Sequence, residues 1–287
     1  MTSFIPSAKR SIADLPPLRA VLAQHGIVTR KSLGQHFLFD LNLTRRIVAA
    51  AGDLTDVNVV EVGAGPGGLT RALLESPARH VWAVERDARC IAALEEVAAV
   101  AGGRLSLIEA DALTLDIAQA VPAPRRIIAN LPYNIGTALL LGWLAVPTDF
   151  IGLTLMFQKE VADRLTAEPR SKSYGRLSIL TQWLCETRHL FDVNPSAFVP
   201  PPAVVSTVVE LIPRAVPLFP ADRTALETVT RYAFGQRRKM LRQSLKPVGG
   251  ESLLERAGIT PTARAEELSV EAFCALANAF VSPGAAR

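Results

Sequence analysis

Few cysteines, no long apolar run and no internal repeat occur in this chain of 287 residues. Its three cysteines, Cys90, Cys185 and Cys274, lie far apart and form no CxxC pair, which excludes a disulfide framework and a cysteine-built zinc site. The most apolar run, Ile135 to Val146, is interrupted by Gly142 and is shorter than the roughly 20 residues that cross a membrane. The charged N-terminus is not followed by the apolar stretch of a signal peptide. We therefore expect a cytoplasmic protein with no metal site and no membrane contact.

The composition is that of a folded protein with two parts. Apolar residues make up 49% and charged residues 20% of the chain, which excludes a mainly disordered protein. A chain of this length is expected to form one domain of roughly 200 residues and a smaller companion. Pro213, Pro217 and Pro220 make a stiff joint, after which the pattern is helical. We predict an N-terminal arm over residues 1–30, a main domain over 31–213 and a helical domain over 214–287.

Positive charge is concentrated at the start of the predicted helical domain. The net charge of +4, with a pI near 9.2, is a weak sign of a polyanionic partner. The segment from Arg214 to Lys246, however, contains eight basic residues and only two acidic ones. Such runs are often solvated helix faces, but here apolar neighbours would anchor one face and display the other. We expect RNA-backbone binding by Arg237, Arg238, Lys239 and Arg242.

Short β-branched strands alternate with helical segments through the main domain. This alternation predicts an α/β fold in which a mostly parallel sheet carries helices on both faces. A later β-branched run, Val204 to Ile212, is expected to close the sheet edge as an antiparallel strand. The first five strands are expected at 57–62, 80–85, 104–109, 126–129 and 150–157.

A glycine-rich loop, Glu61 to Gly68, follows the first expected strand. Its Gly63-x-Gly65-x-x-Gly68 spacing fits the dinucleotide fingerprint, with Glu85 at the distance of a ribose ligand. By itself the loop is also compatible with a plain tight turn. Acidic or amide groups stand at the ends of four successive strands, where open α/β sheets bind ligands. Hydrogen-bond acceptors at these positions favour a ligand with ribose hydroxyls, amines and a sulfonium, such as S-adenosylmethionine. A ligand with a negatively charged pyrophosphate would be less favoured. These strand-end residues are Glu61, Glu85, Asp111 and Asn130.

The segment Asn130-Leu131-Pro132-Tyr133 ends the fourth strand and is the most specific feature. The exocyclic amine of adenine is a poor nucleophile because its lone pair is delocalised. An acceptor on Asn130 and a nearby carbonyl can bind its N–H groups and free the lone pair for a methyl donor. Pro132 fixes the turn and Tyr133 can stack on a base. The alternative is a simple strand-ending turn.

With these motifs the chain resembles the ribosomal RNA adenine N6-dimethyltransferases, most closely the type acting on small-subunit rRNA. The resemblance runs from about Lys31 to the C-terminal helices. It implies a Rossmann-like class I methyltransferase sheet, mostly parallel with one antiparallel edge strand, and a small all-helical C-terminal domain. The matching segments are 31–38, 61–70, Glu85, 111–112, 130–135, 158–161, 174–178, 198–204 and 234–241.

The resemblance also implies a residue set. Catalysis would involve Asn130, Leu131, Pro132 and Tyr133, with Phe198 stacking on the target adenine opposite Tyr133. S-adenosyl-L-methionine would lie against ten residues: Gln35, His36, Leu38, Gly63, Gly65, Glu85, Arg86, Asp111, Ala112 and Asn130. Relatives often have asparagine in place of His36, a change we expect to be tolerated because the main chain makes that contact.

The function implied is dimethylation of two adjacent adenines near the 3′ end of 16S rRNA, by a monomer acting on the small ribosomal subunit. Three alternatives stay open. A macrolide-resistance methyltransferase would act on large-subunit rRNA, although the Phe198 to Val204 segment favours the small-subunit type. An assembly factor would bind RNA with little catalysis. An NAD-dependent oxidoreductase would leave the Asn130 segment unexplained.

Overall fold

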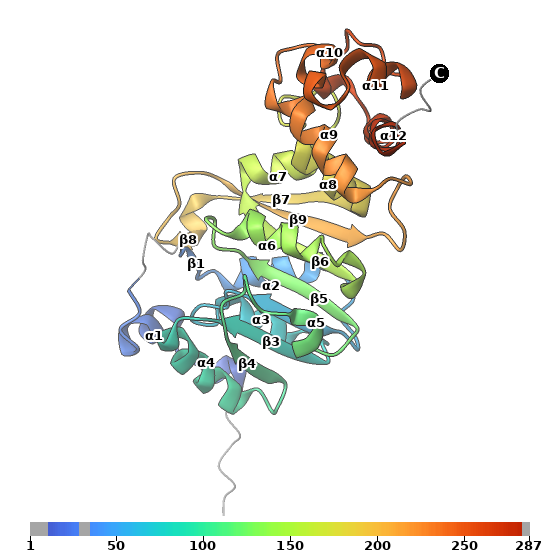
Figure 1. The fold of residues 1–287 in the computed structure, drawn as a ribbon. Coiled ribbons are helices and arrows are strands. Elements are labelled where there is room, and N and C mark those ends of the chain that lie inside the picture. Colours follow the sequence, from blue (N-terminus) through green and yellow to red (C-terminus); the bar gives the residue numbers. More distant parts are fainter. Residues whose placement is uncertain (1–10, 29–34, 283–287) are drawn as a thin grey trace, which may run out of the picture. The chain divides into compact units, whose positions relative to one another are not determined.

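The computed structural model describes residues 11–28 and 35–282, and the chain forms two compact units (Figure 1). The first unit contains the residues up to Lys159 together with Leu190–Glu210, and the second contains Glu160–His189 and the residues from Leu211 onward. The segment 160–189, which was predicted to be part of the main domain, therefore belongs to the second unit. The division at 30 and 213 into functional domains stays a prediction.

The first unit is built on parallel strands joined by helices. Four strand pairs are parallel, namely β2 with β3, β3 with β4, β2 with β5 and β5 with β6. Its strands are β1 (Phe37–Leu38), β2 (Asn58–Val62), β3 (His80–Glu85), β4 (Leu105–Glu109), β5 (Arg125–Asn130), β6 (Gly152–Gln158) and β8 (Phe198–Val199). Its helices are α1 (Leu18–Gln24), α2 (Leu41–Ala50), α3 (Gly68–Glu75), α4 (Ala88–Val100), α5 (Ile117–Ala120) and α6 (Gly136–Trp143).

The sheet order is β4-β3-β2-β5-β6-β9-β7, with β9 at Ser206–Pro213 and β7 at Cys185–Val193. From β2 the chain builds outward through β3 and β4, and then returns to β5 on the other side. The carboxyl ends of β2 and β5 therefore flank the point where the strand order reverses, which is the usual ligand crevice of such sheets. The sequence places the glycine loop and the Asn130 segment at these two ends.

The predicted α/β class and the five parallel-type strands are confirmed to within two residues at each end. One expectation about the edge is wrong, because β9 lies inside the sheet and β7 forms its edge. Five of the nine residues of β7 are polar or charged and only two are buried, so their composition gives no apolar alternation from which a strand could be inferred.

The second unit is mainly helical, as predicted. It contains α7 (Lys159–Leu165), α8 (Arg176–Leu184), α9 (Arg223–Gly235), α10 (Leu241–Ser244), α11 (Gly250–Arg256) and α12 (Val270–Val281). Its core includes Phe273 and Tyr174. The half-buried Phe234 stacks on Phe273 at a centroid distance of 5.6 Å and meets Tyr174 edge-on at 6.2 Å. The cysteines are buried and unpaired by disulfides. Within the described part of the chain, no helix combines the length and apolar character needed to span a membrane.

Candidate active site

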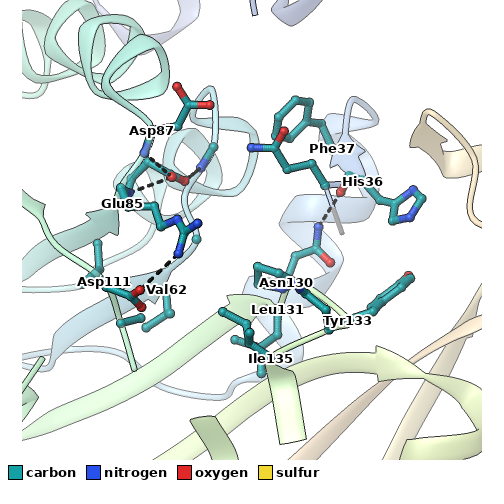
Figure 2. Close-up of a pocket in the computed structure, with 18 of the residues that line it drawn as sticks. His36, Phe37, Val62, Glu85, Asp87, Asp111, Asn130, Leu131, Tyr133 and Ile135 are labelled. Carbon is teal, nitrogen blue, oxygen red and sulfur yellow. Dashed lines mark hydrogen bonds and ion pairs between the residues drawn. The ribbon is translucent and has the colours of Figure 1, made fainter. Parts of the chain in front are cut away.

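A pocket opens at the carboxyl ends of β2, β3 and β5, where sequence analysis expected a ligand (Figure 2). The predicted residues come from five separate segments of the chain, and the fold brings them to one place. Those that line the pocket are Gln35, His36, Gly63, Gly65, Glu85, Arg86, Asp111, Ala112, Asn130, Leu131, Pro132 and Tyr133.

The glycine loop is tightly enclosed by the segment before α2. Gly65 has a φ of +56°, and a Cβ there would lie 2.9 Å from the ring of Phe37. At Gly68 a Cβ would lie 2.5 Å from the carbonyl oxygen of Leu38. The loop can pass this close to the 37–38 segment only without side chains. Leu38 itself is buried behind the loop and does not line the pocket.

Glu85 holds the end of β3 against the glycine loop. Its Oε2 accepts from the Gly65 N–H at 2.9 Å, and its Oε1 accepts from the N–H groups of Arg86 and Asp87 at 2.8 and 2.9 Å. A carboxylate offers about four acceptor positions. One position is therefore left for a hydroxyl donor on a ligand, which is what binding a ribose requires.

Asp111 and Arg86 lie on neighbouring strand ends and form an ion pair. Arg86 Nη1 is 3.1 Å from Asp111 Oδ2, and the Leu113 N–H donates to Oδ1 at 3.0 Å. Both side chains of the pair are about half exposed, so the pair contributes little to stability. A ligand amine can therefore compete with Arg86 for the carboxylate at small cost.

Asn130 is oriented by the main chain of His36. The Nδ2 group of Asn130 donates to the His36 carbonyl at 2.9 Å, as the dashed line in Figure 2 shows. A carbonyl can only accept, so this contact determines which end of the amide faces it. The Oδ1 atom is consequently the end available to accept from a ligand amine. This is the polarity that the sequence argument requires.

The side chain of Tyr133 is held by two contacts, one through its hydroxyl and one through its ring. Its hydroxyl is hydrogen bonded to the hydroxyl of Ser206, and its ring stacks on that of His36 at a centroid distance of 5.2 Å. Burial raises the pKa of Tyr133, so the phenol is neutral at physiological pH. Ser206, in β9, was missed by sequence analysis because no local motif marks a serine as the partner of a residue more than 70 positions away.

Phe198 lies near this group but not in the pocket lining. It is 2% exposed, pairs with Leu38 between β8 and β1, and belongs to the core of the first unit. Its ring meets His36 edge-on at 6.4 Å. Stacking of Phe198 on a target base stays a prediction, and it requires a face of the ring to become accessible.

Glu61 differs from the other strand-end acids, because it does not face the pocket. It alternates along β2 with Val62, which does line the pocket, and successive side chains of a strand point to opposite faces. Its carboxyl is 2% exposed and accepts a hydrogen bond from the Thr70 hydroxyl. Burial, opposed by this bond, raises the pKa of Glu61 to about 8. Glu61 therefore stabilises the loop from behind.

The predicted RNA-binding residues lie in the second unit. Arg237, Arg238 and Lys239 occupy a turn between α9 and α10, not the helix that their spacing suggested. Arg237 donates to Glu266 at 2.7 Å and to the Ser171 carbonyl at 3.0 Å. Arg238, Lys239 and Arg242 are exposed, and Arg242 is 3.7 Å from Glu251.

The described part of the expected N-terminal arm, residues 11–28, is folded against α3 and α4. Val21 and Ile27 pack with Cys90 and with Phe37, a pocket-lining residue. Arg71 donates to the Pro16 carbonyl at 2.7 Å. This segment therefore supports the pocket from outside. The rest of the predicted arm, 1–10 and 29–30, lies outside the described residues.

The family model of the ribosomal RNA adenine dimethylases matches residues 27–281. The chain belongs to this family. A ribosomal RNA small subunit methyltransferase A from Paramagnetospirillum magneticum is 66% identical over 270 residues, which cover 94% of this chain and 96% of the relative. The corresponding protein from Rhodospirillum rubrum is 61% identical over 271 residues, 94% of each chain.

Two solved structures of at least 26% identity share the fold. A dimethyladenosine transferase from Plasmodium falciparum is 26% identical, with a TM-score of 0.71 over 84% of this chain and 96% of that one. The 23S rRNA methyltransferase ErmE is 28% identical, with a TM-score of 0.64 over 85% and 99%. The predicted resemblance and the methyltransferase class are thus confirmed. The alternative of an NAD-dependent oxidoreductase is wrong, because the chain belongs to the adenine dimethylases.

Proposed function

We propose that this chain transfers methyl groups from S-adenosylmethionine to N6 of two adjacent adenines near the 3′ end of 16S rRNA, within the small ribosomal subunit. The observation that carries the proposal is the orientation of Asn130, whose Oδ1 atom is left to accept from an amine at the end of β5. The relatives from Paramagnetospirillum magneticum and Rhodospirillum rubrum bear the name of small-subunit methyltransferases, which supports the choice of substrate.

The acceptor groups of the pocket fit the proposed cofactor. Glu85 has one acceptor position left for a ribose hydroxyl, and Asp111 can receive an adenine amine in exchange for Arg86. When bound, S-adenosylmethionine would supply an electrophilic methyl group on a sulfonium centre. Gln35, Ala112 and the glycines at 63 and 65 would form the walls around it.

The chain's own residues would activate the target by position and hydrogen bonding. Asn130 would accept from the adenine N6–H, which favours a pyramidal nitrogen whose lone pair can attack. Tyr133 would stack on the base, and Pro132 would hold the turn that aims both side chains. A base in an RNA helix must leave its stack to reach such a site. The exposed cations of the second unit would bind the RNA backbone.

A large-subunit substrate is the second candidate, and the similarity to ErmE over most of its length favours it. Transfer of labelled methyl groups to isolated ribosomal subunits that lack adenine dimethylation tests both. We expect label in the small subunit only, recovered after digestion as dimethyladenosine. Label in the large subunit would establish the second candidate, and cofactor binding without transfer to either would indicate an assembly factor.

A further inference from the structure

The side chain of His36 lies where a target base would be expected. Its imidazole ring stacks on Tyr133 with an interplanar angle of 29°, and it meets Phe198 edge-on at 81°. Its Nδ1 group donates to the carbonyl oxygen of Pro200 at 2.8 Å. Figure 2 shows the ring directed to the Tyr133 side of the pocket, away from Glu85 and Asp111.

The imidazole therefore contacts both aromatic residues between which a target base is predicted to stack, a position termed the slot. Centroid distances of 4.5–7 Å are those of rings in direct contact, so no base fits between His36 and either neighbour. Phe198 is 2% exposed and offers no ring face to a ligand. A base that stacks between Tyr133 and Phe198 must therefore displace the imidazole. The imidazole is also the five-membered half of a purine in shape and in its two ring nitrogens.

We propose that the His36 side chain is a placeholder for the target adenine, and that base entry drives it out of the slot between Tyr133 and Phe198. This inference rests on the proposed adenine methylation. It assigns the side chain to the target site, separate from the main-chain contact at the cofactor pocket. The His36 carbonyl stays bonded to Asn130, so rotation about the Cα–Cβ bond can move the ring without disturbing that contact.

The placeholder lowers the apparent affinity for the target. Only the fraction of molecules with the ring displaced can accept a base, and the apparent dissociation constant rises by the reciprocal of that fraction. One hydrogen bond and one ring stack hold the imidazole in place, each worth roughly a factor of a few in population. Removing the ring should therefore improve target binding by about threefold to tenfold.

The first test is His36→Ala, with His80→Ala as the matched control. His80 lies at the start of β3, at the end of the strand away from the pocket, and its side chain contacts Ser106. With unmethylated small subunits, His36→Ala should lower the KM for subunits about threefold to tenfold and leave the dissociation constant of S-adenosylmethionine unchanged. A raised KM would mean that the base stacks on His36 as a wall of the slot, and an unchanged KM would mean that the ring is not in the slot. Either result overturns the proposal.

A second measurement does not depend on the ribosomal substrate. The chain has four histidines, so their ring-proton NMR signals can be assigned by replacing each in turn. The His36 signals should be shifted upfield by the Tyr133 ring, and adenosine added with S-adenosylhomocysteine should return them toward free-histidine values. Signals that start unshifted, that stay in place or that move further upfield contradict the proposal. If the wild-type protein methylates no small subunits, the proposed substrate is wrong and this spectrum alone decides about the slot.

Discussion

The hydroxyl of Tyr133, in the turn after β5, is hydrogen bonded to the hydroxyl of Ser206, in β9. Ser206 is fully buried, and the bond fixes the position of the Tyr133 hydroxyl beside the pocket. Ser206→Ala leaves a half-buried phenol without this partner, at a cost of about 1 kcal/mol. We expect kcat to fall by about tenfold, with S-adenosylmethionine affinity unchanged.

A double-mutant cycle separates positioning from general destabilisation. In Tyr133→Phe the bond is also lost, so the double variant with Ser206→Ala should be only as slow as the slower single variant. Additive effects of the two substitutions on kcat would show that Ser206 does not act through Tyr133. Thermal unfolding of all three proteins provides the control for stability.

Asn130→Ala removes the oriented amide and should lower the rate of methyl transfer about a hundredfold or more, by analogy with the loss of one directed hydrogen bond in other active sites. Single-turnover transfer with saturating cofactor measures this step directly. Asn130→Asp is the matched comparison, because its carboxylate has no N–H to donate to the His36 carbonyl. A folded Asn130→Ala protein with near-normal turnover would refute the proposed activation of the amine.

Local sequence patterns predicted the strands, the glycine loop and the strand-end side chains of the pocket, because those features depend on β-branched runs, glycines and strand-end residues close in sequence. Other predicted lining residues, among them Gln35, His36 and Ala112, came from the family resemblance. Contacts between distant segments were less accessible. Strand alternation turned Glu61 away from the pocket, and the edge strand β7 has too polar a composition to be read as a strand. The Ser206 partner of Tyr133 becomes visible only when β9 is placed inside the sheet.

The exposed cations Arg238 and Lys239 offer the clearest test of RNA binding by the second unit. Reversing both charges to Glu should weaken RNA binding. The logarithm of the binding constant should also fall less steeply with the logarithm of the salt concentration, by the amount expected for the loss of about two phosphate contacts. Arg237 is unsuitable for this purpose, because it pairs with Glu266 and with the Ser171 carbonyl. Binding measured from low to moderate salt checks the slope.

For a matched control, charge reversal at Arg188, which pairs with Glu186, changes the net charge without touching the predicted RNA-binding group. Arg188→Glu changes the net charge by the same amount as Arg238→Glu alone, so equal losses of binding in these two single variants would reduce the effect to net charge. An unchanged salt slope in the double variant of Arg238 and Lys239 would remove these two residues from the RNA interface.

Glu61 should make the stability of the protein depend on pH. Its pKa is raised by burial to about 8 in the folded protein, against an ordinary value near 4.3. Between these values the folded chain keeps a proton that the unfolded chain releases. The free energy of unfolding should therefore be highest below the ordinary value and fall as pH rises to about 8, by up to about 1.4 kcal/mol per pH unit.

Glu61→Gln keeps the size of the side chain and an acceptor for Thr70 but cannot ionise. Urea unfolding of both proteins at pH 5.5 and 7.5 isolates the contribution of Glu61, because the other titrating groups are shared. We expect the free energy of unfolding of the glutamine variant, relative to that of the wild type, to be higher at pH 7.5 than at pH 5.5. A constant difference at both values would mean that Glu61 is ionised in the folded protein, with its charge compensated inside the loop. The same pair of proteins also reports on function, since a looser loop would weaken S-adenosylmethionine binding without altering the pH dependence.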